Sequence, residues 1–171
     1  EGIQGEVSVQ FIQQPTNEIF DVQFGITPFW NPSKNRIVWV QNSQSTMRTV
    51  NIGDTWLQGV ESFLKMQFFQ KIHTNTQLTW NHSINLTKDP LVANKELPRI
   101  PKWNMSQSLR LLVTSNVSFG YDYQFASPNY WDEANWFGST NRSIHNFNFT
   151  STWRAFMWKV EIYNLQNNLV E

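Results

Sequence analysis

The chain has 171 residues, of which 13 are basic and 13 acidic; it has no cysteine, and aromatic and charged residues make up 15% each. The balanced charge argues against a nucleic-acid binder, and the lack of cysteine excludes a thiol nucleophile, a thiolate metal site and a disulfide scaffold. Soluble domains usually carry about 25% charged residues, so a chain this rich in aromatic and neutral polar residues suits either a sheet between lipid and a wet lumen or a secreted all-β sandwich.

Apolar and polar residues alternate with a period of two along most of the chain, which is typical of β-strands with two different faces. For example, Phe20, Val22 and Phe24 alternate with Asp21 and Gln23. The alternation predicts about eight strands, near residues 7–11, 18–27, 60–66, 72–81, 105–113, 117–125, 147–153 and 156–162. Several have about nine or more residues, enough to cross a bilayer at a tilt, whereas sandwich strands usually have about five or six. The lengths favour a membrane barrel.

The predicted connections alternate between short turns and long loops. Short turns are expected near residues 14–17, 69–71, 114–116 and 154, and long loops near 32–47, 84–102 and 126–143. Outer-membrane barrels sort their connections in this way, with short periplasmic turns and long extracellular loops. Tryptophans near the predicted strand ends, such as Trp30, Trp103 and Trp153, suit the aromatic girdles of such barrels, although core packing in a soluble sheet gives the same pattern.

No residue pattern points to catalysis. His73, His82 and His145 are isolated, and neither a metal-ligand pair of histidines nor a nucleophile motif is present. We therefore expect no catalytic residues, no metal site and no cofactor, and we do not interpret the chain as an enzyme.

One segment resembles a known family. Residues 51–61 read Asn-Ile-Gly-Asp-Thr-Trp-Leu-Gln-Gly-Val-Glu, which is similar to the "NxGxxxxxGVE" strand of TonB-dependent outer-membrane receptors. The residues that match this motif position for position are Asn51, Gly53, Gly59, Val60 and Glu61. In a strand of this kind we expect Val60 to face lipid and Glu61 to face the lumen, with the glycines allowing close approach.

Further segments resemble the same family in the same order. Residues 1–7, 36–40 and 97–102 are similar to a strand opening, to a continuation after a long hairpin and to the family's "LPRIPKH" segment. Asn164 and Leu165 match part of "VENLFD", the end of a strand near the C-terminus, although Tyr163 stands where the family has Glu.

The resemblance implies the C-terminal part of a larger barrel, of the 22-stranded type. Residues 1–171 would form one partial β-barrel domain, without the plug, the early strands and the last strand of the family. Its partners would be outer-membrane lipid, the remaining barrel and plug, TonB acting through that plug, and a small-molecule ligand. The implied location is the bacterial outer membrane, and the implied function is active uptake of a siderophore, cobalamin or similar scarce nutrient.

In the resembled family, the loops and the lumen wall bind the ligand. The loop at 127–136 is the best candidate here, because convergent aromatic and amide side chains suit a polar organic ligand or a metal chelate. The candidate ligand-binding residues are Asn129, Tyr130, Trp131, Asp132, Asn135 and Trp136.

Alternative interpretations remain at this level. Eight strands suffice for a small barrel that closes on itself, with a structural or interaction role, and the chain also fits one half of a split receptor that needs a partner chain. As part of a larger barrel it should be unstable alone, because its two terminal strands would expose unpaired edges.

Overall fold

The computed structural model describes residues 5–13, 19–41, 46–51 and 53–168. All regular elements of these residues are β-strands, and none of their segments forms a helix long and apolar enough to cross a membrane. The strands are β1 (Gly5–Glu6), β2 (Val9–Gln13), β3 (Phe20–Ser33), β4 (Ile37–Gln41), β5 (Met47–Asn51), β6 (Thr55–Phe68), β7 (Ile72–Asn85), β8 (Trp103–Thr114), β9 (Val117–Ala126), β10 (Arg142–Trp153) and β11 (Phe156–Ile162).

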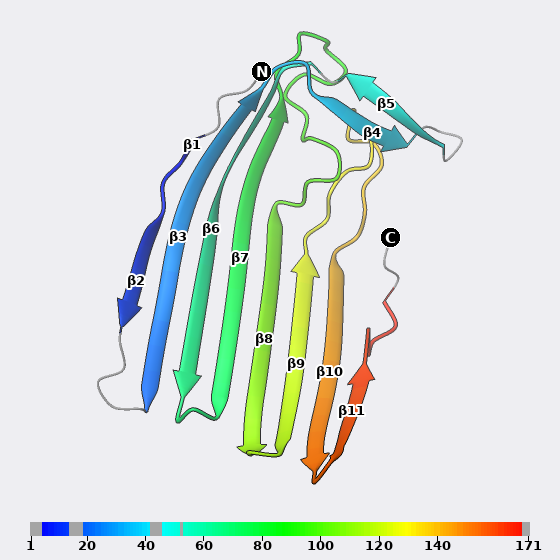
Figure 1. Ribbon diagram of the computed structural model, residues 1–171. Helices are drawn as coiled ribbons and strands as arrows, with labels where there is room; N and C mark the ends of the chain where they lie inside the picture. Colours follow the sequence, from blue (N-terminus) through cyan, green and yellow to red (C-terminus); the bar gives the residue numbers. More distant parts are fainter. Residues whose placement is uncertain (1–4, 14–18, 42–45, 52, 169–171) are drawn as a thin grey trace.

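Nine of these strands form one antiparallel sheet. Eight of them follow one another in the order β1-β3-β6-β7-β8-β9-β10-β11 (Figure 1), and the ninth, β2, also pairs with β3. Both β1 and β2 pair with β3, at its two ends, so together they act as one interrupted strand. The sheet therefore has eight strand positions, and the predicted all-β, antiparallel architecture of about eight strands is confirmed.

The connections are sorted by length between the two ends of the sheet. Two-residue or three-residue turns join β6 to β7, β8 to β9 and β10 to β11, as predicted, and all three lie at one end (Figure 1). The long loops lie at the other end. The short turn predicted at 14–17 lies outside the described residues.

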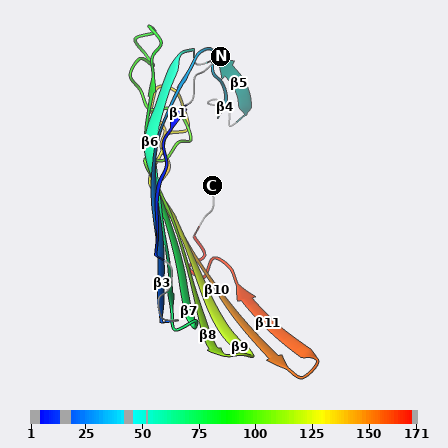
Figure 2. The same cartoon turned by 60° about the vertical axis from the view of Figure 1, so that its left-hand side comes forward.

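The first long connection differs from the prediction. We expected a loop at 32–47, but β3 continues to Ser33 and a separate two-stranded sheet, β4–β5, follows it. The run from Ile37 to Val40 consists of β-branched and aromatic residues, which favour a strand, and β5 gives it a partner. Figure 2 shows this hairpin beside the main sheet, on the side toward which β11 also curves.

The register of the sheet separates an apolar face from a polar face. Val60 is opposite Pro28 and Trp80, whereas Glu61 is opposite Thr27 and Thr79. Because side chains alternate along a strand and directly paired residues share a face, every neighbouring strand extends the same division. Val60 and Glu61 therefore lie on opposite faces, and the contact of Val60 with lipid and of Glu61 with the lumen stays a prediction.

The sheet has almost no core of its own. Among the described residues, only Leu97 and Ala126 are buried apolar side chains, while the large apolar residues of the apolar face are half-buried or exposed. Among those residues, β11 pairs only with β10, and β1 and β2 pair only with β3. The sheet is thus an open, curved wall (Figure 2), as a partial barrel requires, and it does not close on itself as the small eight-stranded barrel would.

The motif at 51–61 begins with a turn rather than a continuous strand. Asn51 ends β5, and its side-chain oxygen accepts a hydrogen bond of 2.8 Å from the backbone N–H of Gly53. Gly53 has a φ of 70°, in the left-handed region that favours glycine, and a Cβ there would also meet the Thr87 side chain. β6 starts two residues later, at Thr55.

The second motif glycine, Gly59, lies inside β6 and is buried. A Cβ at this position would collide with the backbone oxygen of Trp80 and with the ring of Phe29, which lies over the glycine. Gly59 therefore allows an aromatic ring and a neighbouring backbone to approach the strand closely.

Near the C-terminus, the matching residues fasten the end of β11 to β10. The backbone N–H of Asn164 donates to the side chain of Asn146 at 2.9 Å, and that of Leu165 donates to the carbonyl of His145 at 2.9 Å. The Asn164 side-chain oxygen also accepts from the N–H of Asn168. Asn164 and Leu165 thus lie just beyond the end of β11 at Ile162 and hold the chain there against β10.

We expect Gly59→Ala to lower the free energy of unfolding by about 1–3 kcal/mol, because the added methyl overpacks against fixed backbone. Gly120→Ala is the matched control: a Cβ there would meet only the Asn148 side chain, which can rotate away. The measurement is a series of samples of the complete receptor, each heated to a different temperature in detergent and then run on a denaturing gel. The readout is the temperature at which the fast-moving, folded band is lost. Equal losses for the two variants would contradict the role assigned to Gly59.

Candidate ligand-binding loops

Two long loops form a hollow beyond β7–β10, at the end of the sheet opposite the short turns. The β7–β8 loop comprises residues 86–102 and the β9–β10 loop residues 127–141. The hollow has a volume of about 410 Å³. Its lining residues come from both loops and from the start of β8: Glu96, Lys102, Trp103, Ser127, Pro128, Asn129, Tyr130, Gly138 and Ser139.

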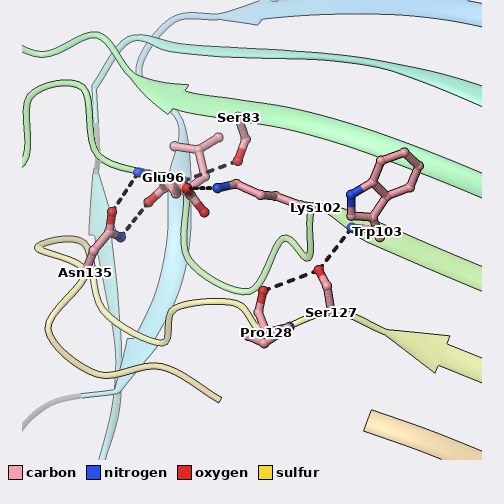
Figure 3. A network of polar contacts seen from close by, with 8 residues as sticks. Ser83, Glu96, Lys102, Trp103, Ser127, Pro128 and Asn135 are labelled. Carbon is pink, nitrogen blue, oxygen red and sulfur yellow. Dashed lines mark hydrogen bonds and ion pairs between the residues drawn. The ribbon is translucent and has the colours of Figure 1, made fainter. Parts of the chain in front are cut away.

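The base of the hollow is fixed where β8 begins and β9 ends. The N–H of Trp103 donates to the Ser127 hydroxyl at 3.0 Å (Figure 3). In return, the N–H of Ser127 donates to the carbonyl of Trp103 at 2.9 Å. This pair continues the β8–β9 ladder by one step, so both loops leave from a rigid base.

The β9–β10 loop is a folded hairpin rather than a loose connection. Tyr130 forms an antiparallel bridge with Gly138. The Asp132 carboxylate then accepts from the N–H groups of Trp136 and Phe137, at 3.1 and 2.8 Å. A charged acceptor with two backbone donors fixes the tip of the hairpin firmly.

Asn135 joins the two loops by a reciprocal pair of hydrogen bonds. Its side-chain oxygen accepts from the N–H of Glu96 at 2.8 Å, and its side-chain nitrogen donates to the Glu96 carbonyl at 2.9 Å (Figure 3). The N–H of Arg99 adds a bond of 2.7 Å to the carbonyl of Tyr130. The Asn135 amide thus takes the place of a strand partner, and the loops are fastened together at two points.

An ion pair lies on the wall of the hollow. The Lys102 Nζ is 2.6 Å from a carboxylate oxygen of Glu96. This hydrogen bond to Glu96 raises the pKa of Lys102 above its ordinary value, although partial burial opposes the change. Because the lysine side chain remains 54% exposed, its charge is accessible to a molecule in the hollow.

The hollow offers a varied set of polar contacts beside aromatic surface. An ammonium, a carboxylate and serine hydroxyls line it together with Tyr130. An anionic or hydroxyl-bearing organic ligand fits this chemistry, since the ammonium can bind an anion and the tyrosine ring can contact a flat surface.

Only two of the six predicted ligand-binding residues, Asn129 and Tyr130, line the hollow. Asp132 and Asn135 use their side chains to hold the loops, and Trp131 is half-buried nearby. Trp136 lies outside the hollow and is 74% exposed. Whether the six bind a ligand stays a prediction.

Sequence reasoning did not identify Glu96, Lys102 or Ser139 as lining residues. The signal available for the first two was a pair of opposite charges six residues apart that flanks the proline-containing stretch 97–101. Across the described residues, no group of three or more His, Cys, Asp or Glu side chains is placed to hold a metal ion.

A second, wider hollow of about 610 Å³ lies near the short-turn ends of β3, β6, β7 and β8. Most of its lining comes from the polar face, including Asp21, Lys65, His73 and Arg110. One Asp21 carboxylate oxygen and the Asn75 side-chain oxygen are buried here without a hydrogen-bond partner. This part of the wall therefore has acceptors available for another segment.

The model of the protein family "TonB dependent receptor-like, beta-barrel" matches residues 1–165 of the chain. A comparison with curated protein sequences gives no match. Among solved structures, the siderophore receptor PiuA from Acinetobacter baumannii is similar with a TM-score of 0.74 and 15% identity, over 98% of this chain and 24% of its own.

Two other solved structures show the same likeness. The siderophore receptor PirA from Acinetobacter baumannii has a TM-score of 0.68 and 16% identity, over 97% of this chain and 27% of its own. The ferric-catecholate import receptor Fiu from K12 E. coli has a TM-score of 0.67 and 11% identity, over 98% and 24%. The chain thus spans about a quarter of the length of these structures, and from the match over residues 1–165 it belongs to the TonB-dependent receptor family, as part of the β-barrel.

Proposed function

We propose that this chain is the C-terminal wall of an outer-membrane receptor that takes up a scarce nutrient, such as a siderophore complex or cobalamin, through a plug coupled to TonB. The observation that carries the proposal is the family match over residues 1–165 of a wall with one apolar and one polar face. Such a wall satisfies its backbone hydrogen bonds within the sheet, as a lipid environment demands.

The polar face supports contact with a plug. The hollow near the short turns has charged and amide side chains, and the buried oxygens of Asp21 and Asn75 have no partner there. A plug segment that donates hydrogen bonds would satisfy both oxygens, since buried acceptors are costly when they are left unpaired.

The loop hollow supports binding of a small, polar ligand. PiuA and PirA are siderophore receptors and Fiu is a ferric-catecholate import receptor. A complex of Fe(III) with three catecholate groups is anionic. Lys102 supplies a cation at the hollow, and Tyr130 supplies aromatic surface. The hollow of about 410 Å³ is within the usual size range of ligand pockets.

The direct test uses the complete receptor purified in detergent. Equilibrium binding of a ferric catecholate, a ferric hydroxamate and cyanocobalamin would be measured, followed by uptake of the bound compound in cells with and without TonB. Binding of one of these together with TonB-dependent uptake is expected. Failure of all three compounds to bind would overturn the proposed substrate class.

Adjacent residues on β6 test the placement of the apolar face in lipid. Val60→Lys should reduce the free energy of folding into the membrane by about 2–4 kcal/mol, because it puts a charge on the lipid side. Glu61→Lys places the same side chain on the polar face one residue further on, and should assemble normally. The readout is the amount of protease-resistant receptor in the outer membrane. Similar yields of the two variants would contradict this placement.

Lys102→Ala should weaken ligand binding about tenfold, equivalent to about 1.4 kcal/mol, because the hollow loses its cation. Lys88→Ala is the matched control, since Lys88 is exposed in the same loop but does not line the hollow. Titration of the bound compound with each purified variant gives the two dissociation constants. An unchanged affinity of Lys102→Ala for the bound compound would contradict the proposal that the ligand binds in this hollow.

Asn135→Ala should also weaken binding, although Asn135 does not line the hollow, because the variant releases the β9–β10 loop from Glu96. Each lost hydrogen bond contributes about 1 kcal/mol. Asn94→Ala controls for backbone strain, since Asn94 and Asn135 have similar φ values of 61° and 60°. Hydrogen–deuterium exchange in residues 127–141 should rise for Asn135→Ala and stay unchanged for Asn94→Ala. Equal exchange in the two variants would show that the Asn135–Glu96 hydrogen bonds do not hold this loop.

A further inference from the structure

A row of polar side chains interrupts the apolar face. At one register level the residues on β2, β3 and β6 are Phe11, Phe24 and Leu64. On β7 to β10 the same row continues with Thr76, Gln107, Tyr123 and His145. Each of these four lies at least three residues inside both ends of its strand. The row is therefore well inside the wall, away from the turns and loops.

The polar row contains its own hydrogen bonds across β7 and β8. The Thr76 hydroxyl donates to the Gln107 side-chain oxygen at 2.6 Å, and the Gln107 side-chain nitrogen donates to the Thr74 hydroxyl at 2.6 Å. Both bonds are partly shielded from solvent. Gln107 is thus held between two threonines on a face on which most side chains are apolar.

A second group continues the row across β9 and β10. The Tyr121 hydroxyl and the His145 Nδ1 form a hydrogen bond of 2.6 Å, and the rings of Tyr123 and His145 pack with centroids 4.8 Å apart. The Ser143 hydroxyl donates to the Tyr123 hydroxyl at 3.2 Å. We call the seven residues of both groups the outer polar patch: Thr74, Thr76, Gln107, Tyr121, Tyr123, Ser143 and His145.

The outer polar patch keeps unused hydrogen-bonding capacity. The amide nitrogen of Gln107 has two hydrogens, and among the described contacts only Thr74 receives one. Among the described residues, the His145 Nε2 has no hydrogen-bond partner. The Tyr123 hydroxyl accepts from Ser143, and its own hydrogen remains available to donate. The patch thus offers both donors and acceptors outward.

Acyl chains cannot satisfy these groups, and polar side chains inside a membrane commonly mark a functional contact. Apolar side chains border the patch on the same strands, including Met105, Leu109, Phe125 and Phe147. Membrane-embedded surfaces can associate through a polar centre with an apolar border. Lipid and protein are equally apolar around such a centre, so the hydrogen bonds at the centre favour contact between proteins.

We infer that the outer polar patch is a contact site for a second copy of this receptor within the membrane. The argument for a second copy is complementarity: a surface that carries unused donors and acceptors together can satisfy itself across a two-fold axis. Lipid esters supply acceptors only, and would leave the hydroxyl acceptors unmatched. The inference rests on the proposed membrane placement of the apolar face.

The experiment uses the complete receptor in its own outer membrane, with a benzophenone-bearing phenylalanine analogue at a single position. Phe147 lies in the border of the patch and Phe24 on β3 outside it, with side chains 38% and 40% exposed. Light should join two receptors through position 147 at least about tenfold more than through position 24. Co-production of light and heavy isotope-labelled receptor identifies the adduct as two copies of the same chain.

The variant Gln107→Leu, combined with the analogue at position 147, should reduce the dimer adduct about tenfold while the receptor still reaches the membrane. If that variant does not assemble, Thr76→Val removes the same hydrogen bond with a side chain of equal shape. An adduct at position 147 with lipid alone or with another protein, or equal dimer yields at positions 24 and 147, would overturn the inference. Lipid adducts at position 24 test the membrane placement of the apolar face separately. Their absence would contradict that placement, whereas it would say nothing about the contact between two receptors.

Discussion

The pairing of every strand with its neighbours is the constraint on which the rest of this wall depends. Antiparallel ladders run without a break from β3 to β11, and they contain a single register irregularity, between Leu112 and Thr114. Since side chains alternate along each strand, the ladder fixes the face of each residue once one pair is fixed. Val60 and Glu61 therefore acquire opposite environments from their place in the register, and not from packing around either residue.

The same kind of pairing holds the loops beyond the sheet. Trp103 and Ser127 extend the β8–β9 ladder by one step, and Asn135 then offers Glu96 the donor and acceptor that a strand residue would offer. The hollow consequently has walls that are fixed by backbone hydrogen bonds, even though few side chains are buried there. A ligand site built in this way does not need a hydrophobic core, which the sheet itself lacks.

Much of the architecture was predictable from the sequence because period-two alternation depends only on residue type. The strands and the three described short turns follow from such local patterns. The hairpin β4–β5 was missed because its length fits a loop, although Ile37 and Trp39 favour a strand. The roles of Asp132 and Asn135 were not predictable, since a carboxylate or an amide in a loop looks the same whether it holds the backbone or awaits a ligand.

The reciprocal bonds between Asn135 and Glu96 have a consequence for how this protein can diverge. Because Glu96 takes part in these two bonds through backbone atoms only, they do not depend on the side chain at position 96, whereas they do depend on the number of residues between β7 and position 96. An insertion in the 86–102 loop would carry position 96 out of reach unless the 127–141 loop lengthened with it. Related receptors that keep an asparagine at position 135 for these bonds should therefore inherit the lengths of the two loops as a pair.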